Sequence, residues 1–176
     1  RDAASAAGAS GGTENPVFVF SGVGSQWISM GRRLRQEEPV FREQFERCNE
    51  LIRQLEGWSL IEEIDADRPA SRLQRIDIMQ PAIFSIQIAL AALWKGWGVE
   101  PAAGVGHSLG EYAAVYVAGV LTLEEAIEAV CTRGRLMNRL TGQGGMLAAE
   151  LNVDQAREMI AGMSGRMSLA AWNSPV

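Results

Sequence analysis

The sequence contains 176 residues, of which 47% are apolar, enough for one domain with a sizeable core and a smaller appendage. Acidic residues outnumber basic residues by 21 to 16, which gives a net charge of −5. Because this charge is spread without long like-charged runs, the composition argues against nucleic acid as a partner.

The metal-ligating residue types are few. The chain contains one histidine, so a zinc site has little support. Cys48 and Cys131 are far apart in segments with helical patterns, which argues against a disulfide framework as well. We therefore expect neither a bound metal nor a bound cofactor.

The amino-terminal residues 1–15, RDAASAAGASGGTEN, predict a flexible linker and show no secretory signal. The longest apolar run, PAIFSIQIALAALW, is too short and too interrupted by Ser85 and Gln87 to span a bilayer. These features predict a cytoplasmic protein with no membrane partner. Because the chain starts at Arg1 and not at Met, we expect it to be a piece of a longer polypeptide.

The first predicted strand is PVFVF, residues 16–20, a short apolar run typical of a buried parallel strand. A glycine loop, SGVGSQW, follows at residues 21–27. Residues 30–57 predict one amphipathic helix with Gly57 as its stop. Its apolar positions recur at helical spacing: Phe41, Phe45, Cys48, Leu51, Ile52 and Leu55.

The central part of the chain changes from polar to strongly apolar. Residues 65–77 are polar and irregular, which predicts a connecting loop. Residues 80–98 are apolar nearly all round, and a helix of that kind is usually buried.

A second strand and two helices come next. Residues 102–106, AAGVG, predict the strand, and residues 109–119 predict a helix whose small residues allow close approach to a sheet. Residues 122–140 predict another helix, which opens with a capping box of Thr122 and Glu125. Strand, sharp turn and helix, repeated, predict an α/β fold with a parallel sheet.

The pattern changes after residue 141. A strand, a helix capped by Asn152 or Asp154, and a second strand are predicted at residues 146–151, 152–163 and 167–172. We therefore divide the chain into the linker at residues 1–15, a large subdomain at 16–141 and one β-α-β unit at 142–176.

The strongest chemical motif is G-x-S-x-G at Gly106-His107-Ser108-Leu109-Gly110. Its glycines allow a tight strand-to-helix turn that exposes the Ser108 hydroxyl as a nucleophile, and the Leu109 N–H is a natural oxyanion donor. Its place between a predicted strand and a predicted helix supports this interpretation over a plain helix-capping serine.

Five segments appear in an order that resembles the acyltransferase domains of polyketide synthases and animal-type fatty acid synthases. They also resemble, more distantly, malonyl-CoA:acyl carrier protein transacylases. The segments are VFVFSGVGSQWISMG, QPAIFSIQIAL, GHSLGE, CTRGRLM and GQGGMLAA. The resemblance covers residues 16–176 and implies the N-terminal part of such a domain. It implies an α/β-hydrolase-like large subdomain and the start of a small ferredoxin-like subdomain, truncated.

The resemblance also implies a reaction. Ser108 would take a malonyl-type acyl group from malonyl-CoA or a related acyl-CoA and pass it to the phosphopantetheine thiol of an acyl carrier protein. The Val23 N–H, at a position where the family often has glutamine, would be the second oxyanion donor. Leu109 is typical of malonyl-selective domains, whereas methylmalonyl-selective domains often carry glutamine there.

Arg133 matches the family arginine that pairs with the free carboxylate of the acyl group, and its position relative to Ser108 favours it over Arg135. A planar guanidinium suits a carboxylate. From the residues alone, an arginine that extends from an amphipathic helix to solvent is an open alternative.

The general base implied by the resemblance is a histidine well downstream of the serine, and this chain ends before it. His107, the neighbour of the nucleophile, is expected to have a supporting role. The expected partners are the acyl carrier protein, the missing C-terminal half of the domain, and the ketosynthase and other synthase domains. Alone, the chain should be nearly inactive and prone to association.

Two other classes of function stay open from the residues. A serine esterase of the α/β-hydrolase type shares the serine motif but needs neither Arg133 nor SGVGSQW. A non-catalytic docking half would bind the carrier protein or complete another chain without loading Ser108.

Overall fold

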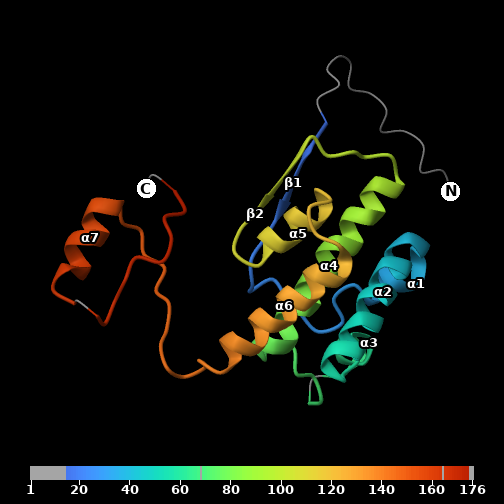
Figure 1. Cartoon of the computed structure of the whole chain (residues 1–176), viewed down its shortest axis with the longest axis horizontal. Helices are drawn as coiled ribbons and strands as arrows, with labels where there is room; N and C mark the ends of the chain where they lie inside the picture. The colour runs from blue at the N-terminus through green and yellow to red at the C-terminus, as the bar shows by residue number, and fades with distance from the viewer. Residues whose placement is uncertain (1–14, 68, 164, 175–176) are drawn as a thin grey trace. The chain divides into compact units, whose positions relative to one another are not determined.

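The structure is a computed structural model that describes residues 15–67, 69–163 and 165–174 (Figure 1). The linker predicted at residues 1–15 lies almost wholly outside the described residues. The chain divides into a larger unit that ends at Thr141 and a smaller one that begins at Gly142.

Two parallel strands form the sheet of the larger unit. Strand β1 (Val17–Phe20) pairs with β2 (Ala103–Gly106) along its whole length, with Val19 opposite Val105. The predicted α/β architecture with a parallel sheet is confirmed. The prediction that the first strand is buried is correct for one face only, because Val19 is 76% exposed and Val105 is 55% exposed. A parallel strand is buried throughout only where both faces are covered.

The covered face of the sheet packs on helix α5 (Gly110–Val117). A Cβ placed on Gly104 would stand 3.6 Å from the Cβ of Ala114 and 3.7 Å from the ring of Phe20. The small residues of α5 therefore let the helix approach the sheet closely, as predicted.

The helix predicted at residues 30–57 is two helices. They are α1 (Arg32–Glu37) and α2 (Pro39–Glu56), and Glu38 between them is extended, with φ −112° and ψ 104°. Proline disfavours the helical conformation in the residue before it and has no N–H to continue the hydrogen-bond ladder. The stop at Gly57 is confirmed, since Gly57 ends α2 in the left-handed conformation with φ 73°.

Helix α3 (Leu60–Asp65) was not predicted, although Ser59 caps it by accepting a hydrogen bond from the Glu62 N–H at 3.2 Å. Helix α4 (Ile76–Gly96) begins four residues before the predicted start at Gln80. By length and hydropathy alone, this helix could span a membrane. The prediction that its apolar run is too short to do so is therefore wrong for the helix as a whole. However, 61% of its most apolar window is buried, as in the core helix of a domain.

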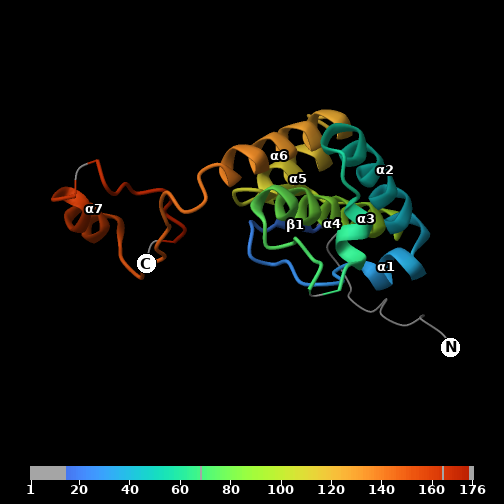
Figure 2. The ribbon, with the colours of Figure 1, turned by 90° about the horizontal axis from the view of Figure 1, so that it is seen from below.

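The core of the larger unit lies among three helices. Helix α4 contacts both α2 and α6 (Leu123–Asn138), and Figures 1 and 2 show the three side by side. The predicted capping box is present at the start of α6, where Thr122 Oγ1 accepts from the Glu125 N–H at 3.2 Å. The largest fully buried apolar side chains are Phe41, Phe45, Phe84, Ile52, Leu60, Ile64, Leu73, Ile78, Ile88, Leu109 and Ile127.

The smaller unit contains α7 (Val153–Ala161), capped by Asn152 and not by Asp154. The strands predicted at residues 146–151 and 167–172 are absent from the described part of the unit. A strand needs a neighbouring backbone to complete its hydrogen bonds, and the two strands of a split β-α-β unit leave room for another strand between them. Neither segment has such a partner among the described residues.

Candidate active site

Ser108 lies at the turn between β2 and α5, with a left-handed backbone of φ 54°. This conformation is costly for a residue with a side chain, and strain of this kind is typical of a nucleophile at a strand-to-helix turn. The turn closes through the Gly110 N–H, which donates to the His107 carbonyl at 2.9 Å. The hydroxyl is therefore presented at the start of a helix, where free N–H groups gather.

Both glycines of the motif are required by close backbone contacts. A Cβ on Gly106 would overlap the main chain of Glu111, and a Cβ on Gly110 would overlap the carbonyl group of Phe20. The sharp turn thus depends on the absence of side chains at these two positions.

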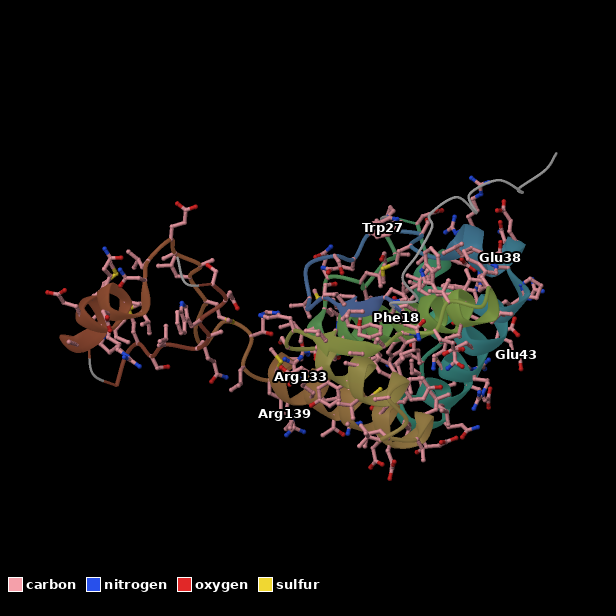
Figure 3. All side chains as sticks on the ribbon, turned by 90° about the horizontal axis from the view of Figure 1, so that it is seen from above. Phe18, Trp27, Glu38, Glu43, Arg133 and Arg139 are labelled. Atoms are coloured by element: carbon pink, nitrogen blue, oxygen red, sulfur yellow. The ribbon has the colours of Figure 1, made fainter. Side chains whose placement is uncertain are left out.

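Arg133 reaches Ser108 from α6. Its Nη2 donates to Ser108 Oγ at 2.9 Å, and its Nη1 donates to Gln80 Oε1 on α4. Figure 3 labels Arg133 on the ribbon of α6. One terminal nitrogen of the guanidinium is thus held by Gln80, and the other contacts the nucleophile.

The neighbouring arginine has a different environment. Arg135 pairs with Glu56 of α2 and donates to Thr132 Oγ1 at 3.0 Å. Of the two arginines considered from the sequence, the one that contacts Ser108 is therefore Arg133.

Gln80 is a candidate site residue that sequence reasoning missed. It is fully buried, and its Nε2 donates to Met137 Sδ at 3.3 Å while its Oε1 accepts from Arg133. A buried amide needs hydrogen-bond partners. A glutamine in an otherwise apolar helix was therefore the signal that could have found it.

The two predicted oxyanion donors lie on adjoining segments. Leu109 directly follows Ser108, and its side chain is fully buried. Val23 lies on the loop after β1 and directly follows Gly22. A Cβ added to Gly22 would stand 3.6 Å from Ser108 Cβ, so this loop passes close to the nucleophile. Within the described residues, neither the Val23 N–H nor the Leu109 N–H donates to an acceptor.

The imidazole of His107 lies against the same loop. Its Nδ1 is 3.2 Å from the position that a Cβ on Gly22 would occupy, and its backbone N–H donates to the Phe20 carbonyl at 3.0 Å. The residue before the nucleophile thus connects the turn to the loop of Val23.

The two cysteine thiols are buried and weakly reactive. Burial raises the pKa of the Cys48 thiol to about 12 and that of the Cys131 thiol to about 12, so both stay protonated near neutral pH. Among the described residues, no three His, Cys, Asp or Glu side chains gather into a possible metal site.

Comparison with known proteins identifies the family to which this chain belongs. The sequence profile of the acyl transferase domain matches residues 17–176. The chain belongs to the acyltransferase domain family. It is 44% identical over 161 residues to the erythronolide synthase EryA2 of Saccharopolyspora erythraea, covering 92% of this chain and 4% of that protein. It is 42% identical over 159 residues to the mycoketide-CoA synthase of Mycobacterium tuberculosis, covering 90% and 4%.

Solved acyltransferase domains have the same fold. The acyltransferase domain from module 8 of the salinomycin polyketide synthase superposes with a TM-score of 0.86 at 37% identity, covering 92% of this chain and 38% of that chain. The MCAT from Streptococcus pneumoniae superposes with a TM-score of 0.73 at 26% identity, covering 85% and 49%. This chain thus spans under half the length of these solved structures.

Proposed function

We propose that this acyltransferase chain transfers a malonyl-type acyl group from coenzyme A, through an ester on Ser108, to the phosphopantetheine thiol of an acyl carrier protein. The reaction would serve polyketide or fatty acid synthesis. Its setting would be a cytoplasmic synthase whose ketosynthase and other domains are the neighbours of this chain.

The observation that carries this proposal is the position of Arg133 between Gln80 and Ser108. An acyl group on Ser108 would be bonded to Oγ, the atom that Arg133 Nη2 contacts at 2.9 Å. In a malonyl ester, one methylene separates the free carboxylate from the ester carbonyl, so that carboxylate lies within reach of the guanidinium. A planar fork pairs with a carboxylate through two parallel hydrogen bonds.

The chemistry follows from these positions. Ser108 Oγ attacks the thioester carbonyl. The negative charge that develops on the carbonyl oxygen is stabilised by the N–H groups of Val23 and Leu109. The C–S bond then breaks, the coenzyme A thiol leaves with a proton, and the ester remains on Ser108. Attack by the carrier thiol reverses these steps and frees the serine.

A base must take the proton of Ser108. His107 is the one histidine in the 176 residues, and it is adjacent to the nucleophile on a sharp turn. We propose that it supports the turn and that the base lies outside this chain. In a comparable serine–histidine pair, loss of the histidine costs on the order of 10⁶ in turnover, so the isolated chain should load very slowly.

The isolated chain should also self-associate. Val19 is 76% exposed, Met146 is 88% exposed and Leu147 is 77% exposed, and burial of such side chains is favourable. We propose that the rest of the domain covers them. A compact, monodisperse monomer in a sedimentation experiment would contradict this part of the proposal.

The test of the proposed function is acyl selectivity in the longest natural polypeptide that contains this chain. Radiolabelled malonyl-CoA and acetyl-CoA are compared as acyl donors for wild type, Arg133→Ala and the control Arg135→Ala. We expect Arg133→Ala to lower malonyl loading by about 10-fold or more, the effect of losing a hydrogen bond between charged groups. Acetyl loading should change little, and Arg135→Ala should behave like wild type. Equal loss of both donors would contradict the role of Arg133.

A further inference from the structure

Gln87 connects α4 to the loop that carries the oxyanion donor Val23. Its Nε2 donates to the Ser21 carbonyl at 2.7 Å and lies 3.5 Å from Ser21 Oγ. Ser21 directly follows β1 and lies two residues before Val23. The opposite amide orientation would place Oε1 against a carbonyl oxygen, two acceptors facing each other, so the hydrogen bond fixes the side chain.

The same carbonyl also lies close to the serine turn. A Cβ on Gly110 would stand 2.8 Å from the Ser21 oxygen. The peptide group between Ser21 and Gly22 is therefore close to both α4 and the start of α5. Because consecutive peptide planes are linked by only two dihedral angles, its direction constrains where the Val23 N–H points.

The other end of the amide indicates what Gln87 contributes. Its Oε1 is buried and accepts no hydrogen bond within the part of the chain that the structure describes. An unsatisfied buried acceptor costs about 1–3 kcal/mol. A methionine of similar length would pack at this position without that cost, so the contribution of the amide lies in its donor.

We propose that Gln87 is a positioning residue for acyl transfer. By holding the Ser21 carbonyl, it keeps the Val23 N–H directed at the oxyanion that forms when Ser108 attacks an acyl group. This role rests on the proposed function and deepens it. The oxyanion exists only in the tetrahedral state, so loss of the hydrogen bond lowers kcat and leaves KM nearly unchanged.

The experiment uses Gln87→Met in the full natural polypeptide, with Gln44→Met as the matched control. Gln44 is a mostly buried glutamine on α2 that donates to the Tyr116 hydroxyl at 3.3 Å, away from the loop. Two reactions of Ser108 are measured: loading from malonyl-CoA, and labelling by a fluorophosphonate, which needs the nucleophile and the oxyanion donors but no malonyl recognition.

We expect Gln87→Met to slow both reactions about 10-fold or more, as misplacement of a reacting group does, with KM for malonyl-CoA unchanged. Gln44→Met should match wild type. Gln87→Asn, which keeps the amide on a shorter side chain, should react at intermediate rates. If Gln87→Met folds poorly, the rates of Gln87→Asn decide whether Gln87 has the positioning role. Wild-type rates in both Gln87 variants would overturn the proposal.

The two proposals fail separately. If wild type is labelled by the fluorophosphonate but takes no malonyl group, the proposed function is wrong. The role of Gln87 is then decided by the labelling rates of its variants. If wild type loads malonyl groups and the Gln87 variants react as fast by both readouts, only the positioning role is wrong.

Discussion

Gly134 of α6 lies directly against the backbone of Asp77 at the start of α4. A Cβ on Gly134 would stand 3.1 Å from the Asp77 Cα. This close approach of the two helices brings Arg133, the residue before Gly134, beside Gln80. The guanidinium position is therefore set by a helix contact that involves neither substrate nor nucleophile.

A larger side chain at Gly134 should separate the helices. We expect Gly134→Leu to lower the free energy of unfolding by about 3 kcal/mol, the upper range for overpacking a core, and to reduce malonyl loading. Glu128→Leu, at an exposed position of the same helix, is the control and should change neither quantity by much. Urea unfolding followed by tryptophan fluorescence checks the first effect, and wild-type stability of Gly134→Leu would contradict the account.

The serine turn should not accept a side chain at its second glycine. We expect Gly110→Ala to abolish fluorophosphonate labelling of Ser108, because the added methyl group would overlap the carbonyl of Phe20 and force the turn apart. Gly145→Ala is the control, since nothing lies within 4 Å of a Cβ at that position. Labelling of Gly110→Ala at the wild-type rate would show that the turn is not as tight as described.

Most of the larger unit could be predicted because its local signals agree with its packing. The glycines around Ser108, the capping box at Thr122 and the stop at Gly57 act over a few residues, so the sequence shows them directly. The break at Pro39 was also visible in the sequence. It was overlooked because the apolar spacing continues through it, whereas the proline alone decides the backbone of Glu38.

Features that depend on distant parts of the chain were harder to predict. Gln80 contacts Arg133 across 53 residues, and Gln87 contacts Ser21 across 66. The strands predicted at residues 146–151 and 167–172 are absent for the same reason, since a short apolar segment does not supply the neighbouring strand that a sheet requires.

Gln80 should matter for malonyl recognition more than for turnover. We expect Gln80→Met to raise KM for malonyl-CoA about 10-fold, because Arg133 Nη1 loses its acceptor and the guanidinium is no longer held in place. KM for acetyl-CoA, which has no free carboxylate, should be unaffected. Steady-state kinetics with both donors check this, and an equal rise in both KM values would point to a general structural defect.

The capping box should contribute to stability and not to chemistry. Thr122→Ala removes the acceptor of the Glu125 N–H and should cost about 1 kcal/mol of unfolding free energy. Malonyl loading per folded molecule should stay at the wild-type level. Thr141→Ala, at an exposed position after α6, provides the comparison and should leave the unfolding midpoint unchanged.

The two cysteines should react with thiol reagents only after unfolding. Burial raises the pKa of Cys48 and of Cys131 to about 12, so near pH 8 almost no thiolate is present at either site. We expect slow reaction with Ellman's reagent in the native state and fast reaction in urea. Cys48→Ser and Cys131→Ser assign the signals, and rapid native labelling that either variant removes would contradict the burial.

The central claim is that Ser108 carries the acyl group, and intact-mass spectrometry of the full natural polypeptide after mixing with malonyl-CoA tests it most directly. The account predicts a mass increase of one malonyl group in wild type, no increase in Ser108→Ala, and loss of the adduct when carrier protein with phosphopantetheine is added. A malonyl adduct that persists in Ser108→Ala, or its absence from wild type, would contradict the claim.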